Sequence, residues 1–159
     1  MKKVVVLGIA ALLIFGGLFL KVFASTPSDE AMIQEALTTA AQASGEGKEG
    51  SVLEYLSGNL QVMGFTPSKN DIRNYIQKNK PKVKLGAIRP IINGDEAVVN
   101  TSAEVRMGVG NLSATQKLDR VTITMRKETK LKMLVFPVPT WRIVKVSAES
   151  ADLGNPFDP

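Results

Sequence analysis

The amino-acid sequence predicts an α+β domain that follows an N-terminal membrane-targeting segment. Three observations lead to this fold class: an uncharged apolar run at Val4–Leu20, apolar residues at helical spacing up to about residue 80, and alternation with a period of two from Lys82 onward. Helices followed by a run of antiparallel strands are typical of α+β domains. We therefore expect helices packed on one face of a curved antiparallel sheet.

The first 24 residues have the arrangement of an export signal. Lys2 and Lys3 precede the apolar run Val4–Leu20. Seventeen apolar residues exceed the usual core of a cleaved signal, about 7–15 residues, and approach the roughly 20 residues that span a bilayer. We therefore expect residues 1–24 to stay as a signal anchor, a single-pass transmembrane helix that contacts the membrane through Val4 to Leu20 and holds an extracytoplasmic domain.

Cleavage of this segment is the alternative. Val22-Phe23-Ala24 offers short side chains at the positions that a signal peptidase reads, so a cut before Ser25 would release a secreted or periplasmic protein. Lys21, just upstream, makes a poor cleavage region. No cysteine follows the run, which excludes a lipoprotein anchor.

Composition restricts the chemistry of the remaining chain. Residues 25–159 suffice for one domain, which we place at 25–147, followed by a flexible, Pro-rich tail at 148–159. The sequence has no cysteine and no histidine. Triads built on Ser-His or Cys-His, thiolate nucleophiles and Cys-based metal sites are therefore excluded, and we predict no catalytic residue, no cofactor and no metal site.

Two helices and a short strand are predicted before residue 66. Thr26-Pro27 supplies a cap and a first helical residue, and the helix runs over 29–43 with Asp29 and Glu30 in its first turn. A short helix over Val52–Leu56 and a strand over Asn59–Phe65 follow.

A further helix is predicted over 69–79. Ser68 and Asp71 have capping-box spacing, although Asp replaces the usual Glu or Gln, and Pro81 ends the helix. Asn93-Gly94 then joins strands at Lys82–Ile92 and Ala97–Met107 in a hairpin, because this dipeptide tolerates the positive φ of a primed turn.

The remaining strands alternate in the same way. Val121, Ile123 and Met125 share one face of a third strand. Strands over Leu131–Phe136 and Trp141–Val146 are predicted to be separate, because Pro137-Val138-Pro139 is incompatible with a central ladder.

This order of elements resembles the nuclear transport factor 2-like superfamily, a cone-shaped α+β fold with a cystatin-like sheet. The resemblance rests on the helix at 29–43, the helix at 69–79 that opens onto the hairpin at 82–107, and the terminal Thr140-Trp141-Arg142-Ile143-Val144-Lys145-Val146 strand. It implies little about activity, since such folds serve isomerases, dehydratases, ligand-binding proteins and assembly modules. Its enzymes place a base and a hydrogen-bond donor inside the cone, whereas the inward strand positions here carry no carboxylate.

Three other patterns carry little chemistry. Gly45-Glu46-Gly47-Lys48-Glu49-Gly50 matches a nucleotide-binding spacing but follows a helix and carries two carboxylates, so we expect a flexible loop. Asp95-Glu96 lies at a hairpin tip, where solvent keeps carboxylates ordinary. The lysines from Lys78 to Lys84 lack interleaved aromatic residues, so we expect no nucleic-acid partner.

These observations predict a non-catalytic, membrane-tethered interaction or assembly module of the cell envelope. Its partner is an envelope protein, or a second copy in a homodimer through the sheet. The alternative is an exported protein that binds a small apolar ligand inside the cone; an isomerase- or hydratase-like enzyme is less favoured. The residues expected to line such a pocket are Tyr55, Met63, Phe65, Met107 and Trp141.

Overall fold

The computed structural model describes residues 27–109, 112–132 and 136–149. The segment predicted to be a signal anchor, residues 1–24, lies outside the described residues, and so do residues 150–159 of the predicted tail. Among the helices within the described ranges, none is both long and apolar enough to cross a membrane.

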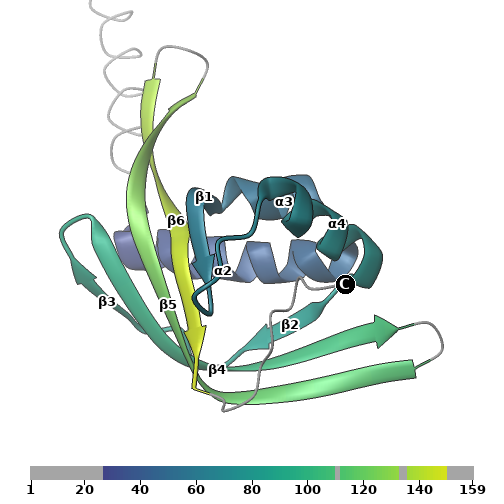
Figure 1. The fold of residues 1–159 in the computed structure, drawn as a ribbon. Helices are drawn as coiled ribbons and strands as arrows, with labels where there is room; N and C mark the ends of the chain where they lie inside the picture. Colours follow the sequence, from purple (N-terminus) through teal and green to yellow (C-terminus); the bar gives the residue numbers. More distant parts are fainter. Residues whose placement is uncertain (1–26, 110–111, 133–135, 150–159) are drawn as a thin grey trace, which may run out of the picture.

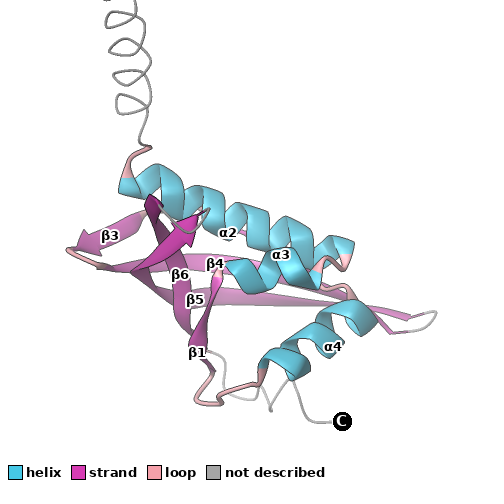
Figure 2. Ribbon diagram, turned by 90° about the horizontal axis from the view of Figure 1, so that it is seen from above, coloured by secondary structure: helices cyan, strands magenta, loops and turns pink. Residues whose placement is uncertain are grey.

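Three helices lie on one face of a strongly bent sheet (Figures 1 and 2). The elements are α2 (Asp29–Glu46), α3 (Glu49–Glu54), β1 (Leu56–Val62), α4 (Lys69–Asn79), β2 (Lys82–Leu85), β3 (Pro90–Asn93), β4 (Glu96–Val109), β5 (Leu112–Lys132) and β6 (Phe136–Ala148). The six strands follow the order β1-β6-β5-β4-β2, and β3 also pairs with β4. The predicted α+β class is confirmed.

The sheet is mixed, so the expected purely antiparallel sheet is wrong at one edge. β2 to β6 pair antiparallel, whereas β1 pairs parallel with β6, with Leu56 opposite Ile143 and Val62 opposite Val146. A parallel pair needs a long crossover connection. The chain between β1 and β6, which contains α4 and four strands, provides it.

α2 begins at Asp29 as predicted, but its cap lies two residues after the predicted Thr26, and the helix ends three residues later than predicted. The cap is Ser28, whose hydroxyl accepts a hydrogen bond from the Ala31 amide at 3.2 Å. Gly47 ends the helix at φ 73°, a backbone conformation that glycine adopts without strain. Residues 45–50 therefore form an ordered junction between α2 and α3, and the flexible loop expected there is wrong.

α4 has the predicted bounds, and its capping box is confirmed. The Ser68 hydroxyl accepts a hydrogen bond from the Asp71 amide at 3.2 Å, and the Asp71 carboxylate accepts one from the Ser68 amide at 2.9 Å. Lys80 then takes a left-handed conformation immediately before Pro81. Aspartate thus completes the box in place of glutamate.

The strand predicted over Lys82–Ile92 is divided into β2 and β3, which both pair with β4. Gly86 lies so close to β4 that a Cβ atom there would be 2.5 Å from the Ser102 hydroxyl oxygen. Pro90, which has no amide hydrogen, is the first residue of β3. The edge beside β4 is therefore interrupted at residues 86–89.

β6 runs through Pro137 and Pro139 as one strand, so the predicted separation into two strands is wrong. Pro139 pairs with Thr129 of β5. The Ile143 amide donates a hydrogen bond to the Tyr55 carbonyl at 2.8 Å, on the side of β6 where β1 lies. Pro137 and Pro139 precede Ile143 by an even number of residues, so their nitrogens point to the same side as that amide. The proline nitrogens therefore face away from β5. β1 begins only at Leu56, opposite Ile143, and no other described strand pairs with β6 beside the two prolines, so no donor is needed there.

The core lies between α2 and the inward face of β4, β5 and β6. The predicted shared face of Val121, Ile123 and Met125 is confirmed, because all three are buried, and Val99, Ala103, Trp141 and Ile143 are buried with them. α2 contributes Ile33, Ala36, Leu37 and Ala40, which recur at helical spacing. β6 ends at Ala148, one residue beyond the predicted domain boundary.

Candidate functional site

An open hollow of about 430 Å³ lies between the start of α2 and the free edge of β6. Its walls are Pro27, Met32, Glu35, Ala36, Tyr55, Val138, Pro139, Thr140 and Trp141. Val138 is 39% exposed, whereas Trp141 is 1% exposed. The hollow therefore has a fixed aromatic residue in its wall and an accessible apolar rim.

Tyr55 and Trp141 are positioned by backbone pairing. Tyr55 follows the last residue of α3, and its carbonyl accepts the hydrogen bond from the Ile143 amide at 2.8 Å. Trp141 lies opposite Lys127 in the antiparallel register of β5 and β6. Helix α3 and strand β6 thus bring together two aromatic residues that are 86 positions apart in the sequence.

A polar cluster joins the first residue of α2 to the sheet beside this hollow. The Trp141 indole donates to Asp29 Oδ1 at 3.0 Å, and Lys127 Nζ donates to Asp29 Oδ2 at 2.8 Å. Lys127 Nζ also lies 5.3 Å from the centre of the Trp141 ring, within cation–π range. One carboxylate therefore satisfies the indole and the ammonium together.

The electrostatics of this cluster keep Asp29 ionised. The hydrogen bond from Lys127 lowers the pKa of Asp29 below its usual value of 3.8, the hydrogen bond from Trp141 lowers it further, and partial burial opposes both. A general base is most effective when its pKa lies near the working pH. Asp29 has the opposite shift, which suits a structural ion pair.

Of the five residues predicted to line a pocket, the structure brings Tyr55 and Trp141 together in this hollow. Met63 and Phe65 lie in the turn after β1, where Phe65 is 43% exposed. Met107 lies under α4, where its sulfur accepts a hydrogen bond from the Tyr75 hydroxyl at 3.0 Å. Burial raises the pKa of Tyr75.

The pairing of Asp29 with Lys127 was not predicted from the sequence. Asp29 was assigned only to the positive end of a helix. Lys127 continues the inward series of Val121, Ile123 and Met125, and a charged residue at the end of an inward series indicates a buried partner. That signal could have identified Lys127, although not its partner.

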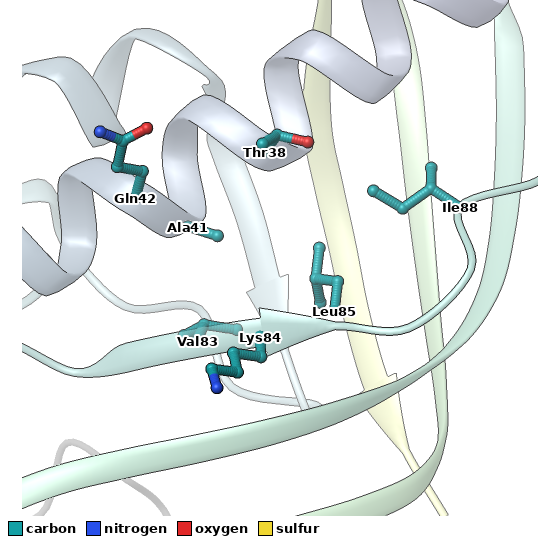
Figure 3. Close-up of a pocket in the computed structure, with 7 residues that line it drawn as sticks. All are labelled: Thr38, Ala41, Gln42, Val83, Lys84, Leu85 and Ile88. Carbon is teal, nitrogen blue, oxygen red and sulfur yellow. The ribbon is translucent and has the colours of Figure 1, made fainter.

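A second groove, of about 380 Å³, lies between the C-terminal half of α2 and the edge strand β2. Figure 3 shows Ala41 of α2, Leu85 of β2 and Ile88 of the following segment around the same space. Thr38, Gln42, Val83 and Lys84 complete the lining. The groove is mostly apolar and is bordered by an exposed lysine.

Four arginines of the sheet form ion pairs with glutamates. Residues 61–145 contain sixteen Lys and Arg against six Asp and Glu. The pairs include Arg126 with Glu96 at 2.8 Å, Arg142 with Glu128 at 3.3 Å and Arg106 with Glu104 at 3.4 Å, and Arg120 pairs with Glu149.

Among the residues that the structure describes, the buried polar residues are Ser44 and Thr101, and no carboxylate is buried. No group of three His, Cys, Asp or Glu side chains among the described residues is placed to hold a metal ion.

Comparisons with known proteins show the fold. No protein-family profile and no curated protein sequence matches the chain. Solved structures that match it include an NTF2-like protein from Cytophaga hutchinsonii, with a TM-score of 0.61 and 14% identity over 79% of this chain and 100% of that chain. Another is an NTF2-like protein with a cystatin-like fold from Novosphingobium aromaticivorans, with a TM-score of 0.55 and 16% identity over 83% and 85% of the two chains.

The fold is NTF2-like. A CaMKII hub from S. rosetta matches as well, with a TM-score of 0.57 and 16% identity over 77% of this chain and 98% of that chain. The resemblance inferred from the order of elements is thus confirmed at the level of the fold. Proteins with an NTF2-like fold have many functions, so the fold alone does not assign a function to this chain.

Proposed function

We propose that this chain is a non-catalytic, membrane-tethered NTF2-like module that binds another protein of the cell envelope. The observation that carries the proposal is the open hollow beside the free edge of β6, with Tyr55 and Trp141 in its wall and Val138 exposed at its rim. Buried aromatic residues surrounded by an exposed rim are typical of energetic centres in protein interfaces. An unpaired strand edge beside them offers backbone acceptors to a partner segment.

The position of the hollow supports a partner at the membrane. Pro27 and Met32, at the start of α2, form part of its wall. If residues 1–24 are retained in the membrane, this wall follows the membrane segment after only a few residues, so the hollow lies close to the bilayer. The partner is then a protein of that membrane or one bound at its surface.

The non-catalytic part of the proposal rests on the protonation chemistry of the site. Asp29 accepts a hydrogen bond from Trp141, and its lowered pKa makes it a poor proton acceptor near neutral pH. Both oxygens of ionised Asp29 are already engaged, one by Lys127 and the other by the indole, which favours a structural role.

Photo-crosslinking tests the interface. With a benzophenone amino acid at Val138 in the full chain expressed in its host, we expect a discrete crosslinked product with an envelope protein. Asn74, exposed on α4, is the matched control position and should give no such product. Tyr55→Ala should reduce the product about tenfold or more, as expected for an interface residue that contributes well over 1 kcal/mol.

Equal products at both positions would contradict the proposed site. A product between two copies of this chain would identify the partner as a second copy, consistent with an assembly role. No product at Val138 in cells that contain the whole envelope would exclude a stable partner at this hollow.

A small apolar ligand is the second candidate function. The hollow, at about 430 Å³, falls within the range of about 300–1,000 Å³ typical of ligand sites. Its open side favours a protein segment, because small-molecule sites usually enclose most of their ligand.

Mass measurements on the protein recovered from its native host test both the tether and the ligand. We expect the denatured mass to include residues 1–24, and the native mass to equal the mass of the polypeptide. A denatured mass that begins at Ser25 would replace the tether with a cleaved signal. An additional mass of a few hundred daltons, lost on denaturation, would favour the ligand-binding function.

A further inference from the structure

The edge strand β2 has free backbone hydrogen-bonding groups along the α2–β2 groove. β2 is the last strand in the sheet order, and β4 is its neighbour. The Gly86 amide donates to the Ser102 carbonyl of β4 at 2.8 Å, and amides two residues apart in a strand point to the same side. The backbone groups of Lys84 therefore face β4. Those of Val83 and Leu85, which we call the β2 edge, face away and pair with no strand among the described residues.

The groove lies directly beside this edge. Val83, Leu85 and Ile88 line it from the sheet side, and Ala41 lines it from α2. Figure 3 shows the side chains of Leu85 and Ile88 directed into the space next to the helix. A strand added at the β2 edge would continue the pleat of the sheet, so its side chains opposite Val83 and Leu85 would enter the groove. The groove therefore favours apolar residues at these two positions of an incoming strand.

The opposite face of the same strand is basic. Figure 3 shows the side chain of Lys84 pointing away from α2. The register aligns Lys84 with Glu104 of β4 and Lys117 of β5, and Arg106 forms an ion pair with Glu104 at 3.4 Å. Within the described ranges, Lys84 and Lys117 have no ion-pair partner. Because directly opposite residues share a face of the sheet, an incoming residue opposite Lys84 would meet a positively charged surface.

Charge disfavours a second copy of β2 as the occupant of this edge. The strand reads Lys82-Val83-Lys84-Leu85, so the positions that alternate with its groove-facing residues are both lysines. Two copies paired antiparallel over the length of β2 would place a lysine opposite a lysine, which destabilises the pair. Lysine on an edge strand usually protects it from such pairing. An acidic residue in the incoming strand replaces this repulsion with attraction.

We propose that the β2 edge binds an extended segment of another protein, which adds to the sheet as an antiparallel strand. The segment carries apolar residues opposite Val83 and Leu85 and an acidic residue opposite Lys84. Its apolar side chains enter the groove between α2 and β2, and its carboxylate lies beside the lysine on the outer face. Backbone hydrogen bonds supply affinity, and the alternation of side chains supplies specificity. This surface is separate from the hollow beside β6, and the inference does not depend on the proposed function.

A peptide of alternating residues tests this binding mode. The probe is a fluorescein-labelled octapeptide of alternating valine and aspartate, titrated with the full chain in detergent and followed by fluorescence anisotropy. We expect saturable binding, and at least about tenfold weaker binding of a peptide with four valines followed by four aspartates, which has the same composition without the alternation. A peptide of alternating valine and lysine should also bind at least about tenfold more weakly, because like charges then lie opposite each other.

Charge reversal on the chain tests the role of Lys84. Lys84→Glu should weaken the binding of the valine–aspartate peptide about tenfold and strengthen the binding of the valine–lysine peptide by a similar factor. Lys145→Glu is the matched control, because Lys145 is exposed on β6 and its reversal changes the net charge equally. The control should change either affinity by less than about twofold.

A bulky side chain in the groove tests the apolar contacts. Thr38→Trp, at an exposed position in the groove wall, should fill the groove and weaken the binding of the valine–aspartate peptide about tenfold. Asn74→Trp, exposed on α4, is the matched control and should leave the affinity unchanged. Circular dichroism verifies that each variant is folded.

N-methylated peptides test the backbone hydrogen bonds without any change to the chain. In an antiparallel strand, the valines that face the groove direct their amides toward β2, whereas the aspartates direct theirs away from it. Methylation of the valine amides should therefore weaken binding at least about tenfold, and methylation of the aspartate amides should weaken it less than about threefold.

Four outcomes would overturn the proposal. The first is no saturable binding of the valine–aspartate peptide up to about 1 mM. Equal affinities of the alternating and block peptides would show that no strand is added. Unchanged binding to Lys84→Glu would remove the basis for an acidic partner. An equal effect of methylation at valine and aspartate would exclude antiparallel pairing with the β2 edge.

Discussion

Trp141→Ala is expected to lower the free energy of unfolding by about 3–5 kcal/mol, the range for removing a buried tryptophan side chain. Trp141 is 1% exposed and is the largest of the fully buried side chains. The substitution leaves a cavity and also removes the indole donor to Asp29. Because domains of this size are stable by only about 5–15 kcal/mol, the loss should be visible as a large shift of the denaturation midpoint.

Guanidinium unfolding of the full chain in detergent, followed by circular dichroism, measures this effect. Trp141→Phe separates the ring from the indole donor, and we expect it to retain more than half of the stability lost in the alanine variant. Ile91→Ala is the matched control, because Ile91 is 61% exposed on β3 and should change stability by less than about 0.5 kcal/mol. A midpoint for Trp141→Ala close to that of the control would contradict the assigned burial.

Asp29→Ala is expected to lower the free energy of unfolding by about 1–2 kcal/mol. It removes two hydrogen bonds to one carboxylate, which are stronger than neutral ones, but the side chains of Asp29 and Lys127 are 32% and 25% exposed, so solvent screens part of the gain. It also removes a negative charge from the first turn of α2. Asn, which keeps an acceptor for the indole, should cost less than Ala.

The pH dependence identifies the charge of Asp29 as the cause. Its pKa is lower in the folded protein than the usual 3.8, so ionised Asp29 stabilises the fold at pH values above the unfolded pKa. This contribution is lost as the pH falls through the folded pKa. The difference in stability between wild type and Asp29→Asn should therefore be constant near neutral pH and shrink below about pH 4.

Lys127→Met provides the matched control from the other side of the pair. It removes the hydrogen bond from Lys127, which is the largest cause of the lowered Asp29 pKa, and leaves the hydrogen bond from Trp141 in place. We expect its loss of stability to shrink over the same acidic range. A difference between wild type and Asp29→Asn that persists unchanged at pH 2 would show that the charge of Asp29 does not stabilise the fold.

Local signals were sufficient where one short stretch of sequence determines the geometry. Ser68 and Asp71 identified the start of α4, and Asn93-Gly94 identified the turn between β3 and β4. The period-two pattern assigned Val99, Val121 and Met125 to the buried face. In each case the partners are neighbours in the sequence, or the pattern follows directly from the geometry of a strand.

Strand pairing and the positions of strand edges could not be predicted from local sequence patterns. Pro137 and Pro139 indicated a break because a proline disrupts a central ladder, yet β6 tolerates both on a free edge. Which part of β6 is an edge depends on β1, which begins at Leu56 opposite Ile143. That pairing joins segments almost 90 residues apart, and no local pattern specifies it.

The candidate site shows the same division. Tyr55 and Trp141 were expected to line a pocket and do line one hollow, whereas Met63, Phe65 and Met107 lie elsewhere. Residue type alone selected all five. Their separation follows from where β1, β4 and α4 pack, which is decided by tertiary contacts.

The sequence by itself determined the presence of the helices, the capping box of α4, the inward face of β5, the α+β class and the absence of histidine and cysteine chemistry. The tertiary structure decided that β1 joins β6 in parallel, that Asp29 pairs with Lys127 and Trp141, and that two grooves open at opposite edges of the sheet. The physical reason is the distance along the sequence over which each interaction acts. Caps, turns and periodicity act over a few residues, whereas pairing, burial of charge and the shape of a hollow depend on segments that only the folded chain brings together.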